Sequence, residues 1–292
     1  LTNGFTGGID ASLLEGQLFT SNYKSANENR SAVTKSIMSR VAAGKTIVLG
    51  PYVRANVREL KARFNSLRKF AMSAVEKNPL YAPGEYRPCS DHTQSGTNEA
   101  TNMRGLCHSI NAYNEIAWFL KLDYVMAVSD VDGAFPILPI APHLWRFFIF
   151  SGYASDKDTV ESLMMHLNGD FGTSGWPGTF KIFFVDVVLQ MARFCQVLTL
   201  PLVCFVDDIG VIGSSCPEVD GEMKRLQVWC ETGPAGVPFK VVKDRKASGN
   251  QLMIGFHWNS TTRTRTLEER KFINYVDMCV GYAGARTMSL QE

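Results

Sequence analysis

The spacing of apolar residues divides the chain into segments with helical or strand character. Six segments have the apolar periodicity and the residue types of helices: 31–43, 54–72, 110–122, 177–194, 217–230 and 267–282. Eight shorter segments are predicted strands: 86–91, 123–131, 143–150, 162–167, 200–206, 209–212, 239–246 and 251–258. The strands 200–206 and 209–212 flank a tight Asp-Asp turn, so we expect them to form a hairpin.

The order of these segments predicts an α+β fold. Helices come first, and strands then alternate with single helices, which is typical of an antiparallel-rich sheet with helices on one face. Residues 1–28 are rich in Gly, Ser, Thr and Asn and are expected to form an irregular lead-in. A chain of 292 residues can form one large domain or two subdomains.

Composition places the chain among ordinary globular proteins. Apolar residues make up 45% of the sequence and charged residues 20%. No apolar run approaches the roughly 18–20 residues that a membrane-spanning helix needs, so no membrane partner is expected. The first residues have no signal-peptide pattern and no initiating Met, so we expect the chain to be cut from a longer polyprotein.

Net charge and cysteine content give limited information about binding partners and cellular compartment. The net charge of +2 is too small to indicate a nucleic-acid partner. One segment, 54–69, carries six basic residues against Glu59 alone; it is either a solvated helix face, the commoner case, or a surface that follows phosphates. The seven cysteines contain no CxxC pair, which argues against disulfide or zinc scaffolds and favours a reducing, intracellular compartment, nuclear or cytoplasmic.

Two apolar strands end in acids. The predicted strand 123–131 carries Asp130 near its end, and the predicted strand 200–206 leads into Asp207 and Asp208. Buried acids are costly unless they are paired or bind metal. If the two strands are neighbours, the three carboxylates converge, and such hard oxygen ligands suit Mg²⁺. Either segment alone would more often be a surface turn.

Three longer strings around these acids resemble the palm motifs of reverse transcriptases. In chain order they are Asp130-Val131-Asp132-Gly133-Ala134-Phe135-Pro136, then Phe171-Gly172 followed by Pro177 and Phe180, and then Phe205-Val206-Asp207-Asp208. The matches occur in the order of the family and, with weaker ones, cover about residues 70–260. The resemblance is to retroelement enzymes of the long-terminal-repeat or tyrosine-recombinase type.

The resemblance implies the fingers and palm of a right-hand polymerase. Residues 29–122 would be fingers-like, 123–258 the palm with part of the fingers, and 259–292 the start of a thumb or connection that is otherwise mostly absent. Asp130, Asp207 and Asp208 would bind two Mg²⁺ ions, or Mn²⁺, about 3.5–4 Å apart.

Nucleotide-binding roles follow from the same resemblance. Arg87 would meet the triphosphate, and Lys77 would be a second basic residue beside it. Phe135 would lie under the sugar and exclude a 2′-hydroxyl, and Phe171 and Gly172 would contact the nucleotide or template. Surface charge or plain core packing is the alternative for each side chain.

Later residues receive roles in the same way. Either Lys243 or Lys246 would be the late palm lysine that donates a proton to pyrophosphate. Gly255 and Phe256 would lie in a hairpin that contacts the primer. The chain departs from the family pattern at Asp170-Phe171-Gly172, where Pro-Phe-Gly or Gln-Gly is more usual. Asp170-Phe171-Gly172 also spells the kinase magnesium motif, but no His-Arg-Asp loop or glycine-rich ATP loop precedes it.

The sequence therefore predicts an RNA-directed DNA polymerase that extends a primer 3′-hydroxyl with dNTPs on an RNA or DNA template. Two alternatives stay open. One is an RNA-dependent RNA polymerase, against which stand Val206, where such enzymes usually carry Gly, and the aromatic Phe135. The other is an inactive reverse-transcriptase-like scaffold that binds nucleic acid or protein.

Overall fold

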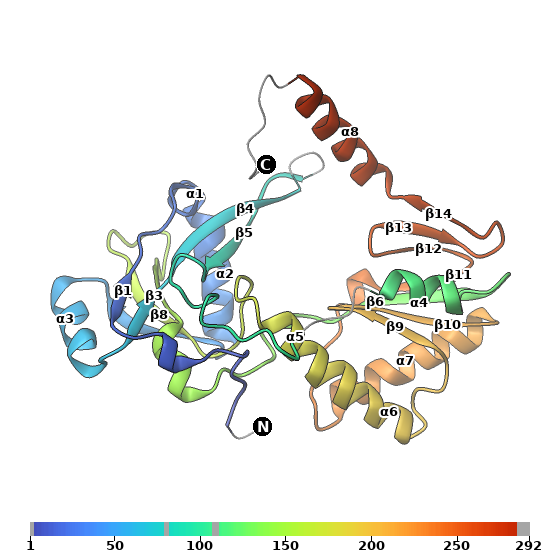
Figure 1. Ribbon diagram of the computed structural model, residues 1–292, viewed down its shortest axis with the longest axis horizontal. Helices are drawn as coiled ribbons and strands as arrows, with labels where there is room; N and C mark the ends of the chain where they lie inside the picture. Colours follow the sequence, from blue (N-terminus) through green and yellow to red (C-terminus); the bar gives the residue numbers. More distant parts are fainter. Residues whose placement is uncertain (1–2, 79–81, 107–110, 285–292) are drawn as a thin grey trace. The chain divides into compact units, whose positions relative to one another are not determined.

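The computed structural model describes residues 3–78, 82–106 and 111–284 and divides the chain into two compact units. The first unit comprises Leu1–His108 and Gly133–Phe184, and the second comprises Ser109–Asp132 and Val185–Glu292. Both units are mixed α/β structures with several sheets (Figure 1). No helix among the described residues is both long and apolar enough to cross a membrane.

A five-stranded sheet is the centre of the first unit. Its strands, in spatial order, are β1 (Gln17–Phe19), β3 (Leu67–Lys69), β7 (Ile149–Gly152), β8 (Ser162–His166) and β2 (Thr46–Pro51). The pairs β1–β3 and β3–β7 are parallel, whereas β7–β8 and β8–β2 are antiparallel. A separate hairpin pairs β4 (Ala71–Asn78) with β5 (Ala82–Asp91). Two short 3-10 helices, η1 (Ala11–Leu13) and η2 (Pro142–Phe147), complete the connections.

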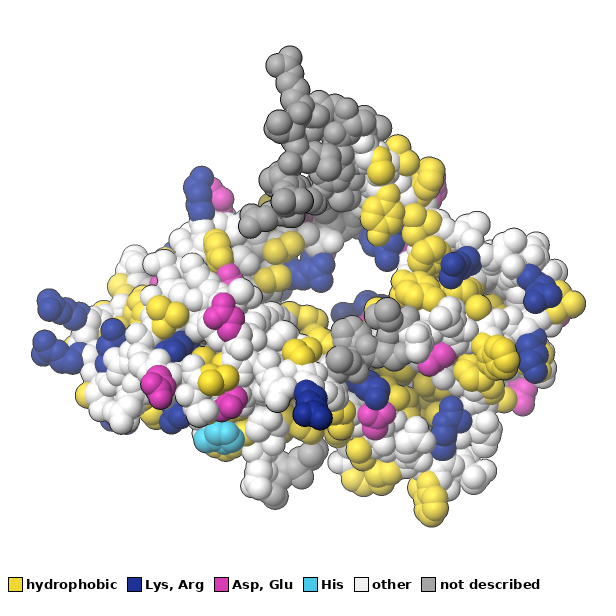
Figure 2. All heavy atoms as spheres, in the orientation of Figure 1, with side chains coloured by type: hydrophobic (Ala, Val, Ile, Leu, Met, Phe, Trp, Pro, Cys, Tyr) yellow, Lys and Arg dark blue, Asp and Glu magenta, His cyan; other side chains and the backbone are white. Residues whose placement is uncertain are grey.

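The basic segment 54–69 separates into an exposed part and a buried part. The exposed part is α3 (Arg54–Arg63), which buries no residue, and Figure 2 shows Lys and Arg side chains standing out over it. Arg68 and Lys69 lie in β3 and are buried, with Lys69 only 1% exposed. Arg68 donates to the carbonyls of Glu15 and Gly16, and Lys69 to that of Thr20. These two charges therefore hold the N-terminal segment and do not face solvent.

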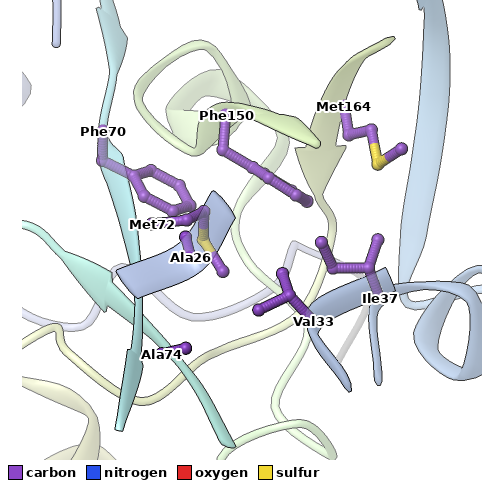
Figure 3. Packing of buried hydrophobic residues seen from close by; sticks show 8 residues of the cluster. All are labelled: Ala26, Val33, Ile37, Phe70, Met72, Ala74, Phe150 and Met164. Atoms are coloured by element: carbon purple, nitrogen blue, oxygen red, sulfur yellow. The ribbon is translucent and has the colours of Figure 1, made fainter. Parts of the chain in front are cut away.

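Helices α1 (Lys24–Glu28) and α2 (Arg30–Ala42) build the core of the first unit with the hairpin and the sheet. Their apolar residues pack against aromatic and sulfur-containing side chains of β4, β7 and β8 (Figure 3). The cluster comprises Ala26, Val33, Ile37, Phe70, Met72, Ala74, Phe150 and Met164. Strand β7 is buried along its whole length, including the polar residue Ser151.

A four-stranded antiparallel sheet is the centre of the second unit. Its spatial order is β11 (Arg245–Ser248), β6 (Val125–Asp130), β10 (Asp208–Gly213) and β9 (Leu202–Phe205). Met126 and Val128 pack with α4 (Ala112–Phe119) on one face, whereas Ser129 contacts α7 (Cys216–Thr232) on the other. The expectation that helices cover only one face is therefore wrong. Burial on both faces explains why the strands are nearly continuously apolar.

A small meander and a last helix follow in the second unit. Strands β12 (Asn250–Met253), β13 (Phe256–Asn259) and β14 (Thr264–Leu267) form an antiparallel sheet, and α8 (Glu269–Gly284) comes next. The helical run 176–194 consists of α5 (Trp176–Phe180), the π-helical segment η3 (Lys181–Leu189) and α6 (Gln190–Phe194). It passes from the first unit to the second after Phe184.

Most predicted elements are present, with some differences. The predicted helix 54–72 ends at Arg63, because Phe64 is extended and burial draws residues 67–78 into β3 and β4. Residues 142–147 form a 3-10 helix in place of a strand, since Pro142 favours a helical start. The strand 239–246 is shorter, beginning at Arg245 after the 3-10 turn η4 (Val241–Lys243). The strand 251–258 is two strands around a turn, and the lead-in contains β1.

Candidate functional site

Asp130 and Asp208 face each other across neighbouring antiparallel strands. Asp130 is the last residue of β6, Asp208 is the first of β10, and the two are register partners. Asp208 also pairs with Phe205, so Val206 and Asp207 form the two-residue turn of the β9–β10 hairpin. The turn begins one residue earlier than the Asp-Asp turn that the sequence suggested. The structure thus brings the three acids together within the second unit.

The backbone of this turn is held in an unusual conformation. Val206 has φ 56°, which a β-branched residue rarely adopts. The amide of Val131 donates to the carbonyl of Asp207 at 2.9 Å, which ties the turn to the end of β6. Strained residues persist where the surrounding structure determines them, and they concentrate at functional sites. The turn is therefore fixed from both strands.

Burial and mutual repulsion act on the carboxylates of the turn. Burial, followed by the charge of Asp130, raises the pKa of Asp207. Burial and the charges of Asp207 and Asp130 raise the pKa of Asp208 to about 6. The site therefore carries more negative charge than its protein surroundings neutralise, and a cation would stabilise it.

Lys243 supplies part of the missing positive charge. It lies in η4 and donates a hydrogen bond to Asp130 Oδ2. Partial burial disfavours its charged form, but the hydrogen bond to Asp130 and the neighbouring carboxylates outweigh burial and raise the pKa of Lys243. Lys246 is instead an exposed residue of β11. Of the two lysines that the sequence left open, Lys243 is the one at the acids.

A polar network connects Asp244, the neighbour of Lys243 in the chain, to the buried side chains of Ser129 and Gln227. Ser129 Oγ donates to Asp244 Oδ1 at 2.6 Å, and Gln227 Nε2 donates to Ser129 Oγ and to Asp244 Oδ2, both at 3.0 Å. The amide of Lys240 donates to the carbonyl of Asp130 at 2.8 Å. These bonds join α7, β6 and the segment that carries Lys243. These bonds were not predicted from the sequence, although Ser129 is a polar residue in an otherwise apolar strand.

The donor set fits a divalent metal ion. Within the described ranges, no group of three or more His, Cys, Asp or Glu side chains is already arranged around a metal position. The three carboxylates are nevertheless hard oxygen donors, and burial together with the neighbouring negative charges raises the pKa of two of them, Asp207 and Asp208. Asp130, Asp207 and Asp208 are the residues that would hold Mg²⁺.

Phe135, Phe171 and Gly172 lie together in the first unit. Phe135 is only 7% exposed and its ring centroid lies 4.9 Å from that of Phe171, which is 51% exposed. Gly172 has φ 137°, and a Cβ there would overlap the carbonyl oxygen of Ser90 in β5. Close contact with β5 is therefore what requires glycine at this position.

The hairpin β4–β5 carries the two basic residues predicted for the triphosphate. Arg87 is exposed and is the register partner of Val75. Lys77 is half-exposed and lies 3.7 Å from the Glu85 carboxylate. The hairpin joins the Phe171 loop through a hydrogen bond of 3.2 Å from the amide of Ser90 to the carbonyl of Phe171.

Gly255 and Phe256 lie at the β12–β13 turn of the second unit. Ile254 and Gly255 both have positive φ, 55° and 78°, as a type I′ hairpin turn requires. Phe256 packs edge-on against Tyr113 of α4, with ring centroids 5.5 Å apart. The amide of Glu268 donates to the carbonyl of Gly255 at 3.0 Å, so the start of α8 is bound to this turn.

The six cysteines that the structure describes form no disulfide with one another. Cys89, Cys195, Cys204, Cys216, Cys230 and Cys279 are all free thiols. The seventh, Cys107, lies outside the described residues.

Several solved structures of foamy viral protease–reverse transcriptase are similar to this chain. The foamy viral protease–reverse transcriptase in complex with RNA/DNA hybrid matches 93% of this chain with a TM-score of 0.63 and 13% sequence identity. The same protein in complex with double-stranded DNA matches 94% with a TM-score of 0.60 and 14% identity. The native prototype foamy virus enzyme matches 87% with a TM-score of 0.58 and 12% identity.

The likeness is one of fold. This chain spans 39%, 31% and 28% of the chains in the double-stranded DNA complex, the hybrid complex and the native enzyme, respectively. No protein-family model matches the sequence, and no curated protein matches it. The chain therefore has a polymerase-like fold of the kind found in a retroviral reverse transcriptase, at low sequence identity.

Proposed function

We propose that this chain is an RNA-directed DNA polymerase that extends a primer 3′-hydroxyl with dNTPs. The observation that carries the proposal is the register of Asp130 with Asp208 around the Val206-Asp207 turn. Two strand ends thereby present three carboxylates in one place, beside the ammonium group of Lys243. The fold shared with foamy virus reverse transcriptase supports the same conclusion.

The finer parts of the fold are assigned within this proposal. The first unit contains residues 29–108 of the fingers-like region and the part of the fingers that follows Gly133, whereas residues 109–122 belong to the second unit. The sheet β11–β6–β10–β9 of the second unit is the palm sheet, and α8 begins the thumb or connection. Further domains of a longer polyprotein belong to the same proposal.

The reaction joins the primer 3′-oxygen to the α-phosphorus of the dNTP and breaks the bond between that phosphorus and the bridging oxygen. Magnesium held by Asp130, Asp207 and Asp208 would activate the 3′-hydroxyl and neutralise phosphate charge. Lys243 has a raised pKa and is protonated at neutral pH. It can therefore give its proton to the departing pyrophosphate and recover one from solvent.

The first unit would bind the incoming nucleotide. Arg87 is exposed and would pair with triphosphate oxygens in bidentate fashion, with Lys77 as a second cation. Phe171 would offer its exposed ring to the nucleotide, Gly172 would hold that loop in place, and Phe135 would discriminate against the 2′-hydroxyl from beneath. In the second unit, Gly255 and Phe256 would contact the primer.

Primer extension tests the proposal directly. We expect the chain to incorporate dNTPs on a primed RNA or DNA template with Mg²⁺ or Mn²⁺, and incorporation to stop with EDTA. Asp207→Asn should abolish incorporation while the circular dichroism spectrum and template binding are retained. Exclusive use of NTPs would indicate an RNA polymerase instead. Template binding without any synthesis would indicate an inactive scaffold, and retained synthesis in Asp207→Asn would refute the site.

A further inference from the structure

Asp170 is a buried carboxylate at the start of the Phe171-Gly172 loop. It is 3% exposed and belongs to a motif in which the family resemblance leads us to expect Pro-Phe-Gly or Gln-Gly. Burial of the carboxylate opposes ionisation, but the charge and hydrogen bond of His92 and the charge of His166 outweigh it and hold the pKa of Asp170 well below its usual range. A buried ionised group needs partners, and its partners show what it holds in place.

The main partner of Asp170 is His92, which follows β5 directly. His92 Nε2 lies 2.8 Å from Asp170 Oδ2, and the His92 side chain is fully buried. An ionised carboxylate only accepts hydrogen bonds, so Nε2–H of His92 is the donor. The ring of His92 is held between Phe70 and Phe148, with centroid distances of 4.4 Å and 5.1 Å. The pair therefore joins the loop to a rigid part of the core.

Two further basic side chains, those of His166 and Arg40, lie near Asp170, and burial lowers the pKa of His166. His166 Nε2, at the end of β8, lies 4.0 Å from Asp170 Oδ2, and its Nδ1 lies 2.7 Å from Thr46 Oγ1. Arg40 of α2 donates to the carbonyls of Asn168 and Gly169 at 3.1 Å. Burial lowers the pKa of Arg40, and the negative charge of Asp170 acts in the opposite direction and favours the charged guanidinium. Positive charge from α2 therefore supports the buried anion.

The residues that follow Asp170 are held by further hydrogen bonds, to Asp170 itself and to Asn98. Thr173 Oγ1 donates to Asp170 Oδ1 at 3.1 Å. Asn98 Nδ2 donates to the carbonyl of Gly172 at 2.9 Å, and Asn98 Oδ1 accepts from the amide of Ser174 at 2.9 Å. The loop is thus closed over its own carboxylate and bound to β5 and to the turn that follows it.

We propose that Asp170 and His92 form a buried brace that holds the Phe171-Gly172 loop against β5. The brace fixes the half-exposed ring of Phe171 and the strand that carries Arg87 in one rigid arrangement. It rests on the proposed function, since both residues are assigned there to the incoming nucleotide. Asp170 and His92 are positioning residues: they are buried and act on the nucleotide only through Phe171 and Arg87.

Amide hydrogen exchange tests the brace without any need for catalysis. Asp170→Asn keeps the shape of the side chain but removes its charge. We expect the amides of Ser90 and Ser174, which hydrogen-bond within the braced region, to exchange faster in this variant. Thr173→Val removes only the second hydrogen bond and should give a smaller change of the same kind. This variant also decides the matter if Asp170→Asn does not fold.

Steady-state kinetics test the consequence. A loosened nucleotide-binding wall should raise the dNTP KM by about 10- to 100-fold in Asp170→Asn, with a smaller change in kcat. Ile37→Val removes one methyl group from the core of the same unit without touching the loop, and should leave both the KM and the two exchange rates unchanged. That control separates loss of the brace from general destabilisation.

The outcomes distinguish the two proposals. Unchanged exchange at Ser90 and Ser174 in both variants, or faster exchange with an unchanged dNTP KM, overturns the brace while the polymerase assignment stands. A wild-type chain that extends no primer overturns the proposed function, and with it the nucleotide role of the brace. Faster exchange together with a raised KM, absent in Ile37→Val, supports the brace.

Discussion

The ammonium group of Lys243 donates a hydrogen bond to the carboxylate of Asp130, which lies 113 positions earlier in the chain. The contact connects the 3-10 turn before β11 to the end of β6. It selects one lysine from a segment that also contains Lys246. Its effect on chemistry can be separated from simple loss of positive charge, because both lysines carry the same charge and differ in position.

Replacement of Lys243 by Met should lower the rate of nucleotide incorporation by about 100-fold or more, as expected for loss of a general acid. Lys246→Met is the matched control, because that side chain is exposed on β11 and should change the rate little. Single-turnover primer extension measures both. Equal losses in the two variants would mean that bulk positive charge matters and that the Asp130 contact does not.

The raised pKa of Asp208 predicts that the stability of the fold depends on pH. Burial and like charges raise the pKa of Asp208 to about 6, above its unfolded value, so the folded protein binds this proton more tightly than the unfolded chain. The free energy of unfolding therefore gains from Asp208 as pH falls from about 6 to about 4. Ionised Asp208 destabilises the metal-free protein at pH 7.

Asp208→Asn should accordingly raise the free energy of unfolding at pH 7 by roughly 1–3 kcal/mol in the presence of EDTA. The gain should shrink through the pH 6 to 4 window and vanish below it. Urea unfolding at several pH values measures the difference, with Asp277→Asn on the exposed part of α8 as control. A gain that stays constant with pH would exclude titration of Asp208 as its cause.

The position of the acids at strand ends was predictable from the sequence because β6, β9 and β10 are largely apolar next to the carboxylates, with Ser129 as the polar exception in β6. Such runs are visible without knowledge of their partners. The sequence predicted a helix at Arg68 and Lys69, and their actual place in strand β3 was not predictable from it. Those side chains favour a helix locally and are buried only because β1, some 50 residues earlier, and β7, some 80 later, pair with β3.

The same limit applies to the polar residues that support the candidate site. Gln227 and Asp244 lie 98 and 115 positions from Ser129, and Asp170 lies 78 from His92. No local sequence pattern predicts such pairs, since each residue taken alone resembles a surface residue. Ser129 within an apolar strand and Asp170 in place of Pro were the only local signs that these positions are special.

The polar network of Ser129, Gln227 and Asp244 should matter for rate as well as for stability. Gln227→Met removes the amide that donates to the buried Ser129 Oγ and to Asp244 Oδ2, which should lower the free energy of unfolding by about 1–3 kcal/mol. Because Asp244 follows Lys243 directly, we also expect a lower incorporation rate. Gln190→Met, on the exposed side of α6, is the control. Lower stability with an unchanged rate would limit the network to a structural role.

Substitutions at Phe135 and Phe171, whose rings are in contact, can separate an effect on stability from an effect on sugar discrimination. Phe135 is buried, so Phe135→Ala should cost about 3–5 kcal/mol of stability, whereas Phe135→Val leaves a smaller void. Phe135→Val should raise incorporation of ribonucleotides relative to deoxyribonucleotides, measured as the ratio of kcat/KM values. Phe171→Ala, at a half-exposed position, should cost less stability than Phe135→Ala. Unchanged sugar discrimination in Phe135→Val would assign this ring to the core alone.

Gly172 and Gly133 both have positive φ, but only one of them is in close contact with a neighbouring strand. A Cβ at Gly172 would overlap the Ser90 carbonyl, whereas one at Gly133, φ 64°, would come no nearer than 3.6 Å to Pro136. Gly133→Ala should therefore cost only the left-handed backbone penalty of about 1–2 kcal/mol. Gly172→Ala must in addition push the loop away from β5, and should cost clearly more stability and raise the dNTP KM. Thermal unfolding and primer extension of the two variants measure this difference. Equal losses of stability would mean that backbone conformation alone requires glycine at position 172, and that the loop is free to move off β5.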